Sequence, residues 1–253
     1  MNAEIISVGS ELLLGQIVNT DAQYIAQKLA ELGINMYYQT VIGDNKERLL
    51  NALATASARS DLIITTGGLG PTMDDLTKET LSNYLGLDLE LDQTSLDFIK
   101  KYFKKLNRPL TENNKKQALM PKGAVILPNH FGTAPGAIIE KSRKTFVVLP
   151  GPPNELQPMF DSYVIPYLSK DSEYKIYSKV LRIFGIGESL VEERIKDILV
   201  NQTNPTIAPL ASQGQVTLRI TVRCRKDQNP LELVEPVERK INERLGDAIY
   251  GSN

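Results

Sequence analysis

Apolar residues between positions 3 and 66 fall into three short runs, separated by two longer segments of mixed apolar and polar residues. The runs are Ile5 to Val8, Tyr37 to Ile42 and Leu62 to Ile64. Short apolar runs are typical of strands buried on both faces, and the segments between them have the spacing of amphipathic helices. Strands that alternate with helices in this way predict βαβ units, in which helices cover a parallel sheet.

The first predicted helix ends at Leu32 and has a clear helical register. Asn19 and Thr20 can cap its start, and Gly33 can end it. One side of this helix is apolar and the other is polar. The apolar side carries Ala22, Ile25, Ala26, Leu29 and Leu32, and the polar side carries Asp21, Gln23, Lys28 and Glu31.

Two later strands run into loops rich in glycine or proline. The strand that begins at Leu62 leads into Gly67-Gly68-Leu69-Gly70-Pro71, and a helix is predicted from Asp74 to Leu81. A strand over 145–149 leads into Pro150-Gly151-Pro152-Pro153-Asn154-Glu155, and a helix is predicted from there to Tyr167. Ligands of open α/β sheets bind at the carboxyl ends of strands, so both loops are candidate binding loops. The remaining predictions before residue 168 are a helical region over 92–120 and strands over 124–127 and 136–139.

The polar run from Leu168 to Glu173 predicts a domain boundary. We expect a first domain over residues 1–170 and a second over 171–253. The first is α/β, a three-layer doubly wound fold with a mostly parallel sheet. The second is a small α+β unit, with strands over 180–184 and 216–224, a helix that carries Leu190 to Leu199, a helix over 231–245 and a short strand at 248–250.

Composition removes several classes of function. The 253 residues carry a formal net charge of −1, which indicates neither a strongly basic nucleic-acid binder nor an acidic tail. One cysteine and one histidine cannot build a disulfide framework or a Cys/His zinc site. No stretch approaches the roughly 18 apolar residues of a membrane span, and the start of the chain does not have the pattern of a signal peptide. We therefore expect a cytoplasmic protein with no membrane or nucleic-acid partner.

The segment from Thr66 to Thr72 carries the strongest local signal. Its three glycines let backbone N–H groups approach a ligand closely, and a helix start adds positive dipole, which together suit a phosphate. The loop lacks the Gly-Lys-Ser/Thr of a Walker motif and the spacing of a dinucleotide fingerprint. Asp74 and Asp75 would repel an anion unless a divalent cation stood between, so the sequence favours a phosphate with a metal ion. Alternatively, both aspartates only stabilise the helix N-terminus.

Three further acidic residues lie in loops predicted at the same end of the sheet. Asp44 is either a second metal-facing carboxylate or an N-cap of the helix that contains Glu47. Glu11, in Gly9-Ser10-Glu11, is either a ligand-facing acid or an ordinary loop charge. Glu155 can orient a ribose hydroxyl or a water molecule, or serve as an acid in the first turn of its helix.

Taken together, Gly9-Ser10-Glu11-Leu12, the segment 66–72 with Asp74-Asp75, and the segment 150–155 resemble the competence/damage-inducible CinA family. The N-terminal domain of that family is similar to the molybdopterin-binding domains of molybdenum cofactor biosynthesis, and the small second domain resembles its KH-like segment. Full-length relatives often continue into a nicotinamide mononucleotide deamidase domain. This chain stops at Asn253, so deamidase activity is not expected of it.

The resemblance implies a metal-dependent pyrophosphatase that hydrolyses ADP-ribose to AMP and ribose 5-phosphate. It assigns the catalytic centre to Asp44 and Asp75, as contacts of a divalent metal such as Mg or Co, with Asp74 in support. A monovalent cation and a homodimer are further expectations. The residues expected to bind substrate are Gly9, Ser10, Glu11, Thr66, Gly67, Gly68, Leu69, Gly70, Thr72, Pro152, Asn154 and Glu155.

Two other functions stay open. Related domains use the same glycine loop and acidic pair to bind or adenylylate a molybdopterin-like ligand, and fold similarity does not decide between these activities. The chain could also be a non-catalytic module that binds a nucleotide.

Overall fold

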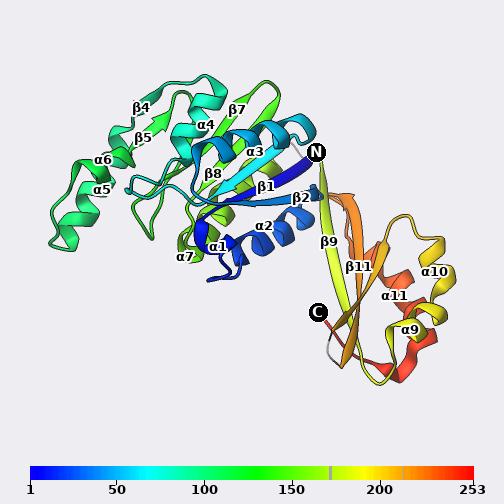
Figure 1. The fold of residues 1–253 in the computed structure, drawn as a ribbon. Helices are drawn as coiled ribbons and strands as arrows, with labels where there is room; N and C mark the ends of the chain where they lie inside the picture. The colour runs from blue at the N-terminus through cyan, green and yellow to red at the C-terminus, as the bar shows by residue number, and fades with distance from the viewer. Residues whose placement is uncertain (171–172, 213) are drawn as a thin grey trace. The chain divides into compact units, whose positions relative to one another are not determined.

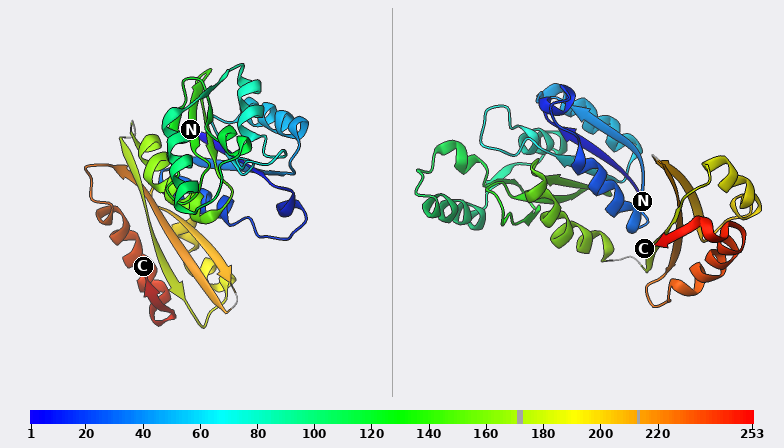
Figure 2. Two further views of the ribbon diagram at one scale, coloured as in Figure 1. Left: turned by 90° about the vertical axis from the view of Figure 1, so that its left-hand side faces the viewer. Right: turned by 90° about the horizontal axis from the view of Figure 1, so that it is seen from below.

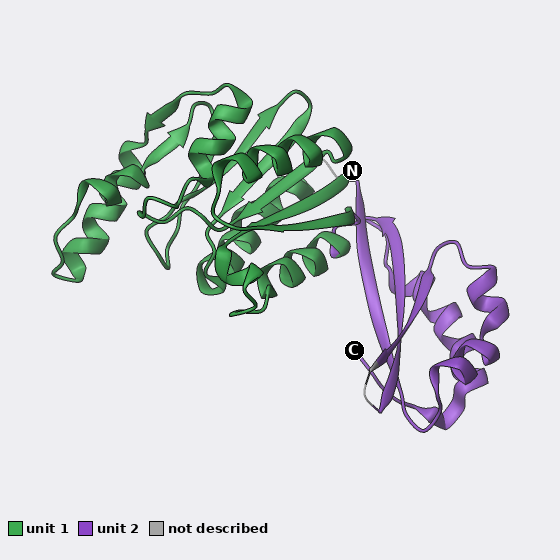
Figure 3. Cartoon of the chain, in the orientation of Figure 1, with its two compact units in different colours: residues 1–30, 34–170 green, residues 31–33, 171–253 purple. Residues whose placement is uncertain are grey.

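The structure is a computed structural model that describes residues 1–170, 173–212 and 214–253. The chain divides into two compact units, one of residues 1–30 and 34–170 and the other of residues 31–33 and 171–253 (Figure 3). Asp171 and Ser172, which belong to the polar run expected at the domain boundary, lie outside the described residues.

The first unit is built on a six-stranded sheet with the order β2-β1-β3-β8-β7-β6 (Figure 1). Neighbouring strands among β2, β1, β3 and β8 pair in parallel, whereas β7 is antiparallel to both β8 and β6. The expected mostly parallel sheet is therefore confirmed. The strands are β1 (Asn2–Val8), β2 (Asn35–Ile42), β3 (Leu62–Thr66), β6 (Val125–Leu127), β7 (Gly136–Lys141) and β8 (Lys144–Leu149).

Helices cover both faces of this sheet, which gives the expected three layers (Figures 1 and 2). On one face lie α3 (Lys46–Arg59) and α4 (Thr77–Leu85). On the other lie α2 (Thr20–Glu31), α7 (Pro153–Met159), the π-helical turn η1 (Phe160–Val164) and α8 (Ile165–Ser169). Tyr24 of α2 packs edge-on against Phe160 and donates a hydrogen bond of 2.6 Å to Asp161, and these contacts join α2 to η1.

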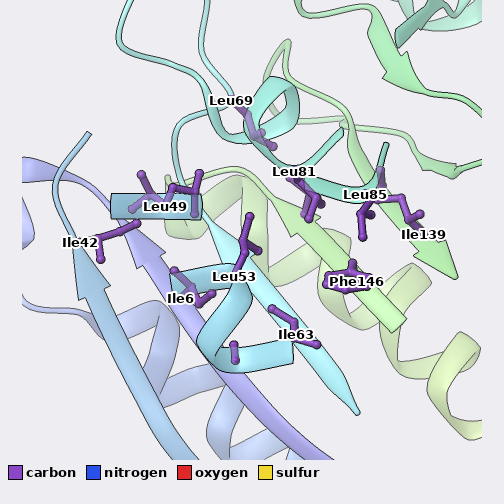
Figure 4. Close-up of a cluster of buried hydrophobic side chains, with 14 of the residues drawn as sticks. Ile6, Ile42, Leu49, Leu53, Ile63, Leu69, Leu81, Leu85, Ile139 and Phe146 are labelled. Carbon is purple, nitrogen blue, oxygen red and sulfur yellow. The ribbon is translucent and has the colours of Figure 1, made fainter. Parts of the chain in front are cut away.

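The core under α3 and α4 shows why these segments fold together (Figure 4). Leu53 of α3 and Leu81 of α4 are fully buried against Ile6, Ile63 and Phe146 of the sheet. Burial of each such side chain contributes about 1.5–3 kcal/mol to folding. Alternate residues of β1 face opposite ways, so Ile6 and Val8 belong to this core while Ser7 faces α2, where Asn19 donates to its hydroxyl at 3.0 Å.

The helical region expected over 92–120 is wrong in part. The structure has α5 (Gln93–Lys105), α6 (Glu112–Lys116) and a small antiparallel pair of β4 (Leu89–Leu91) with β5 (Leu119–Pro121). Helix α5 ends because Asn107 takes a φ of 52° and Pro109 cannot continue a helix. The helix expected from Asp74 begins only at Thr77, and residues 10–13, expected as a loop, form the short helix α1 (Ser10–Leu13).

The second unit has a four-stranded antiparallel sheet with the order β10-β11-β9-β12. Its core includes Leu181, Leu218 and Ile220 of the sheet with Val191 and Ile241 of the helices, so the expected small α+β unit is confirmed. The strand at 206–212, which contains Pro209, was not expected, and the single helix expected over 190–199 is divided at Ile195. The elements are β9 (Tyr174–Ile183), α9 (Glu188–Arg194), α10 (Lys196–Val200), β10 (Thr206–Ser212), β11 (Gln215–Arg225), α11 (Leu231–Leu245), η2 (Gly246–Ala248) and β12 (Ile249–Ser252).

In the part of the chain that the structure describes, no helix combines the length and the apolar character needed to cross a bilayer.

Candidate functional site

A cleft of about 590 Å³ opens in the first unit at the carboxyl ends of β1, β3 and β8. Val8, Thr66 and Pro150, at or just after the ends of these strands, all line it. The chain leaves β1 for α2 on one face of the sheet and leaves β2 for α3 on the other face. Strand order reverses at this point, which is where open α/β sheets bind ligands.

Most of the residues predicted to form the site line this one cleft. Ser10 and Thr72 stand behind the lining and hydrogen-bond to Asp44 and Asp75, respectively. Asn154 is exposed and is not part of the lining. The predicted residues that line the cleft are Gly9, Glu11, Asp44, Thr66, Gly67, Gly68, Leu69, Gly70, Asp74, Asp75, Pro152 and Glu155.

The glycine loop after β3 leaves three backbone donors free. Gly67 and Gly68 have φ angles of 88° and 65°, a conformation that favours glycine. The Gly67 N–H donates to Leu149 O at 3.0 Å, whereas the N–H groups of Gly68, Leu69 and Gly70 donate no hydrogen bond within the described residues. Free N–H groups at the switch point of the sheet form the kind of concavity that holds an anion.

Asp44 is held by the start of α1 and does not cap α3. The Ser10 N–H and hydroxyl both donate to Asp44 Oδ2, at 2.9 and 2.8 Å. The N-cap of α3 is Asn45, whose side chain accepts from the Arg48 N–H at 3.0 Å. The capping role considered for Asp44 is therefore wrong. Its other oxygen, Oδ1, makes no hydrogen bond within the described chain.

Asp74 and Asp75 lie in the loop before α4 and outside its first turn, where Glu79 is the acidic residue. The Thr72 N–H donates to Asp75 Oδ2 at 2.9 Å, and the Thr72 hydroxyl closely approaches both carboxylates. The hydrogen bond from the Thr72 hydroxyl to Asp74 is the main cause that lowers the pKa of Asp74 below its usual value. Because both aspartates precede the helix, bond to Thr72 and line the cleft, their interpretation as simple helix-stabilising acids does not describe the geometry.

Two residues at the end of α6 donate hydrogen bonds to the segment between β3 and α4, which the sequence did not predict. Lys116 Nζ donates to the backbone oxygen of Asp75 at 2.8 Å, and Gln117 Nε2 donates to that of Leu69 at 3.3 Å. Lys78 is buried and donates to the backbone oxygen of Gln117 at 2.6 Å. Burial lowers the pKa of Lys78 to about 8. These bonds fix the position of the loop relative to α4.

Glu155 lies in the first turn of α7, as one interpretation predicted, and also lines the cleft. Asn129 Nδ2 donates to Glu155 Oε2 at 2.6 Å, while Asn129 Oδ1 accepts from the N–H of Gly132 at 2.8 Å. A Cβ atom at Gly132 would lie 2.1 Å from Glu155 Oε2, so a larger residue there would displace this carboxylate from its position. Asn129 was not predicted, because nothing in its local sequence distinguishes it from a turn residue.

Asp21 was placed on the polar side of its helix, and this prediction is wrong. Its side chain is only 8% exposed and lines the cleft at the start of α2. Asp21 Oδ1 has no hydrogen-bond partner within the described residues, and burial raises the pKa of the carboxyl group to about 6. Helical spacing assigns a residue to one side of a helix but does not show which neighbouring segments cover its first turn.

Asp44 and Asp75 are suited to bind a cation that is also bound by a ligand. Within residues 1–170, 173–212 and 214–253, no three Asp, Glu, His or Cys side chains come together as a metal-binding group. Asp44 and Asp75 each use Oδ2 to accept hydrogen bonds from a neighbouring segment, and their Oδ1 atoms accept none from the residues that the structure describes. Mg²⁺ is commonly bound by one or two carboxylates together with substrate phosphates. The donor set therefore fits a divalent cation that arrives with a phosphorylated ligand.

Comparison with known proteins gives matches over both units. A family model described as "Probable molybdopterin binding domain" matches residues 4–170. A second, described as "Damage-inducible protein CinA KH domain", matches residues 178–251.

Similar proteins of known sequence and structure agree with these matches. A "CinA-like protein" from Kosmotoga olearia is 56% identical over 99% of this chain and 61% of its own length. A "Putative competence-damage inducible protein" from Clostridium novyi is 55% identical over 99% of this chain and 60% of its own length. The chain thus spans about 60% of the length of these relatives. The crystal structure of the protein CinA from Thermoplasma acidophilum superposes with a TM-score of 0.59 at 36% identity, covering 64% of this chain and 94% of that one.

Proposed function

The chain belongs to the CinA family, and from this premise we propose that it is a metal-dependent nucleotide pyrophosphatase that hydrolyses ADP-ribose to AMP and ribose 5-phosphate. One observation carries the proposal. Residues 68–70, whose N–H groups donate no hydrogen bond within the described residues, line the same cleft as Asp44, Asp74 and Asp75. Donors for an anion beside carboxylates for a cation are the combination that a pyrophosphate with a metal ion requires.

Each group has a distinct role in this proposal. The N–H groups of Gly68, Leu69 and Gly70 hold phosphate oxygens. Asp44 and Asp75 would hold a divalent cation through their Oδ1 atoms, because Ser10 and Thr72 already occupy the Oδ2 atoms. Hydrogen bonds of this kind orient a metal-binding carboxylate and typically affect metal affinity or activity by about 10- to 100-fold.

The reaction forms a bond between a water oxygen and one phosphorus atom and breaks the bridging P–O bond. The products are AMP and ribose 5-phosphate, and the proton lost by the water passes to solvent. A bound divalent cation would supply charge neutralisation on the phosphate oxygens and would lower the pKa of water. The protein positions the phosphate donors, because Gln117 bonds to Leu69 in the loop that carries them and Lys116 bonds to Asp75 just after it.

The test is AMP formation from ADP-ribose, followed by chromatography with and without Mg²⁺ or Co²⁺. Wild type is compared with Asp75→Asn and with the control Asp97→Asn, an exposed carboxylate on α5 that is not part of the cleft lining. We expect Asp75→Asn to lose activity by about 100-fold or more and the control to keep it. Equal activity and equal metal dependence in all three proteins would reject the proposal.

A second candidate is the binding of a molybdopterin-like ligand, with or without its adenylylation. The match of residues 4–170 to a molybdopterin-binding domain favours it. Absence of AMP under any metal, together with measurable affinity for a pterin phosphate, would support this function over hydrolysis.

A further inference from the structure

The cleft joins the two faces of the sheet. Asp44 and Asp75 enter it from the loops before α3 and α4, which cover one face. Asp21 and Glu155 enter from the first turns of α2 and α7, which lie on the opposite face (Figure 1). The glycine loop, with its free N–H groups, follows the carboxyl end of β3 between these two pairs of acidic residues. A ligand with a central phosphate can therefore extend from Asp44 and Asp75, on the side of α3 and α4, to Asp21, on the side of α2 and α7.

The Asp21 carboxyl group is costly where it stands. It is more than nine-tenths buried, and its Oδ1 atom has no hydrogen-bond partner in the described part of the chain. A buried polar group without a hydrogen-bond partner destabilises the fold. The Cβ–Cγ bond of an aspartate has no narrow preferred torsion angle, so rotation about it can turn either carboxyl oxygen towards the cleft.

Two aliphatic residues close to Asp21 line the cleft, beside the polar Asn19 and Thr20. Ile17 and Val18, just before α2, line the cleft, yet their side chains are 53% and 81% exposed. Pro153, at the start of α7, lines it from the other helix of the same face. Aliphatic side chains gain by covering a flat aromatic ring, whereas they offer nothing to the hydroxyl groups of a sugar.

We propose that Asp21 is a specificity-determining residue, which accepts a hydrogen bond from the exocyclic amino group of an adenine ring lying against Ile17 and Val18. The inference rests on the proposed function and names the substrate class that the site selects. A carboxylate accepts hydrogen bonds and cannot donate them, so it favours a ring with an amino group over a ring without one. Ionised Asp21 predominates at pH 7.5, because its pKa is about 6.

The experiment compares AMP with purine riboside 5′-monophosphate, which differs only in lacking the amino group. Affinities are measured by calorimetry with Mg²⁺ present, so no turnover is needed. We expect wild type to prefer AMP on the order of 10- to 100-fold, the range for a hydrogen bond to a charged group. Asp21→Ala removes the acceptor and should bind both nucleotides alike, Asp21→Asn keeps an acceptor oxygen and should keep part of the preference, and Asp97→Asn should match wild type.

Several outcomes would overturn the inference. They are equal affinity of wild type for the two nucleotides, an undiminished preference in Asp21→Ala, or no binding of either nucleotide. Asp21→Ala loses an unpaired buried carboxyl group and is expected to remain folded, which its melting temperature checks. A preference that depends on Asp21 in a protein that forms no AMP from ADP-ribose would reject the pyrophosphatase function and retain the adenine subsite. Hydrolysis of ADP-ribose that depends on Asp75, in a protein with no preference for AMP over purine riboside 5′-monophosphate, would retain the pyrophosphatase function and reject the adenine subsite.

Discussion

Ser10 donates two hydrogen bonds to a single oxygen of Asp44, from its backbone N–H at 2.9 Å and from its hydroxyl at 2.8 Å. These bonds join the segment that leaves β1 to the loop that leaves β2. They also fix which Asp44 oxygen stays open to the cleft, and this gives the first prediction.

Ser10→Ala keeps the backbone bond to Asp44 and removes the hydroxyl bond. We expect a higher metal concentration for half-maximal hydrolysis of ADP-ribose, on the order of 10-fold, because the carboxylate loses one of two orienting bonds. A titration of activity with Mg²⁺ measures the effect. Ser95→Ala, on α5, is the control. An unchanged metal requirement in Ser10→Ala would show that the Ser10 hydroxyl does not orient a metal-binding group.

Gly67→Ala is expected to destabilise the first unit by about 3 kcal/mol or more, because the added Cβ would lie 2.2 Å from the backbone oxygen of Val8 at a φ of 88°. Gly123→Ala is the matched control, since its φ is 78° but nothing lies within 4 Å of the added atom. That variant should cost only about 1–2 kcal/mol. Urea unfolding of the two variants gives both values, and equal losses would remove the steric argument.

The stability effect of Asp21 depends on pH. Its pKa is about 6 when folded and 3.8 in the unfolded chain, so the folded protein retains the proton over a range in which the unfolded chain has lost it. The stability linked to this group is complete below pH 3.8 and is lost as the pH rises through about 6. Asp21→Asn cannot titrate. The unfolding free energy of Asp21→Asn minus that of wild type should therefore increase by about 2–3 kcal/mol from pH 4 to pH 7. A constant difference between the two proteins across this range would contradict the assignment.

Lys78 should behave in the opposite sense. Burial lowers its pKa from 10.5 to about 8, so the unfolded chain binds more protons than the folded protein between these values. The contribution of Lys78 to stability therefore rises as the pH increases from about 8 to 10.5. Lys78→Met fills a similar volume without a charge and should remove this rise, which amounts to about 2 kcal/mol between pH 7.5 and pH 9.5. Denaturant unfolding at pH 7.5 and pH 9.5 tests it. A rise of equal size in the variant would assign the effect to other groups.

The sequence predicted the fold where a local pattern carried the information. Alternating runs from Ile5 to Ile64 indicated the parallel strands, and the glycines after Thr66 indicated a binding loop at the carboxyl end of a strand. Prediction failed where distant segments decide the outcome. The bonds from Lys116 to Asp75 and from Gln117 to Leu69 join residues more than 40 positions apart, and no periodicity in the sequence indicates them. The burial of Asp21 likewise depends on what surrounds the start of α2. The metal, the homodimer and the cytoplasmic location stay predictions.

The cleft draws its walls from strand ends at Val8, Thr66 and Pro150, which are far apart along the chain and meet only when the sheet is complete. No excised hairpin or single βαβ unit contains all three. Only the completely folded first unit can therefore bind the ligand. Binding should stabilise that whole unit against unfolding by RT ln(1 + [L]/Kd). A bound nucleotide should consequently slow hydrogen exchange at core amides of β1, β3 and β8, well away from the cleft, and not only in the loops it touches.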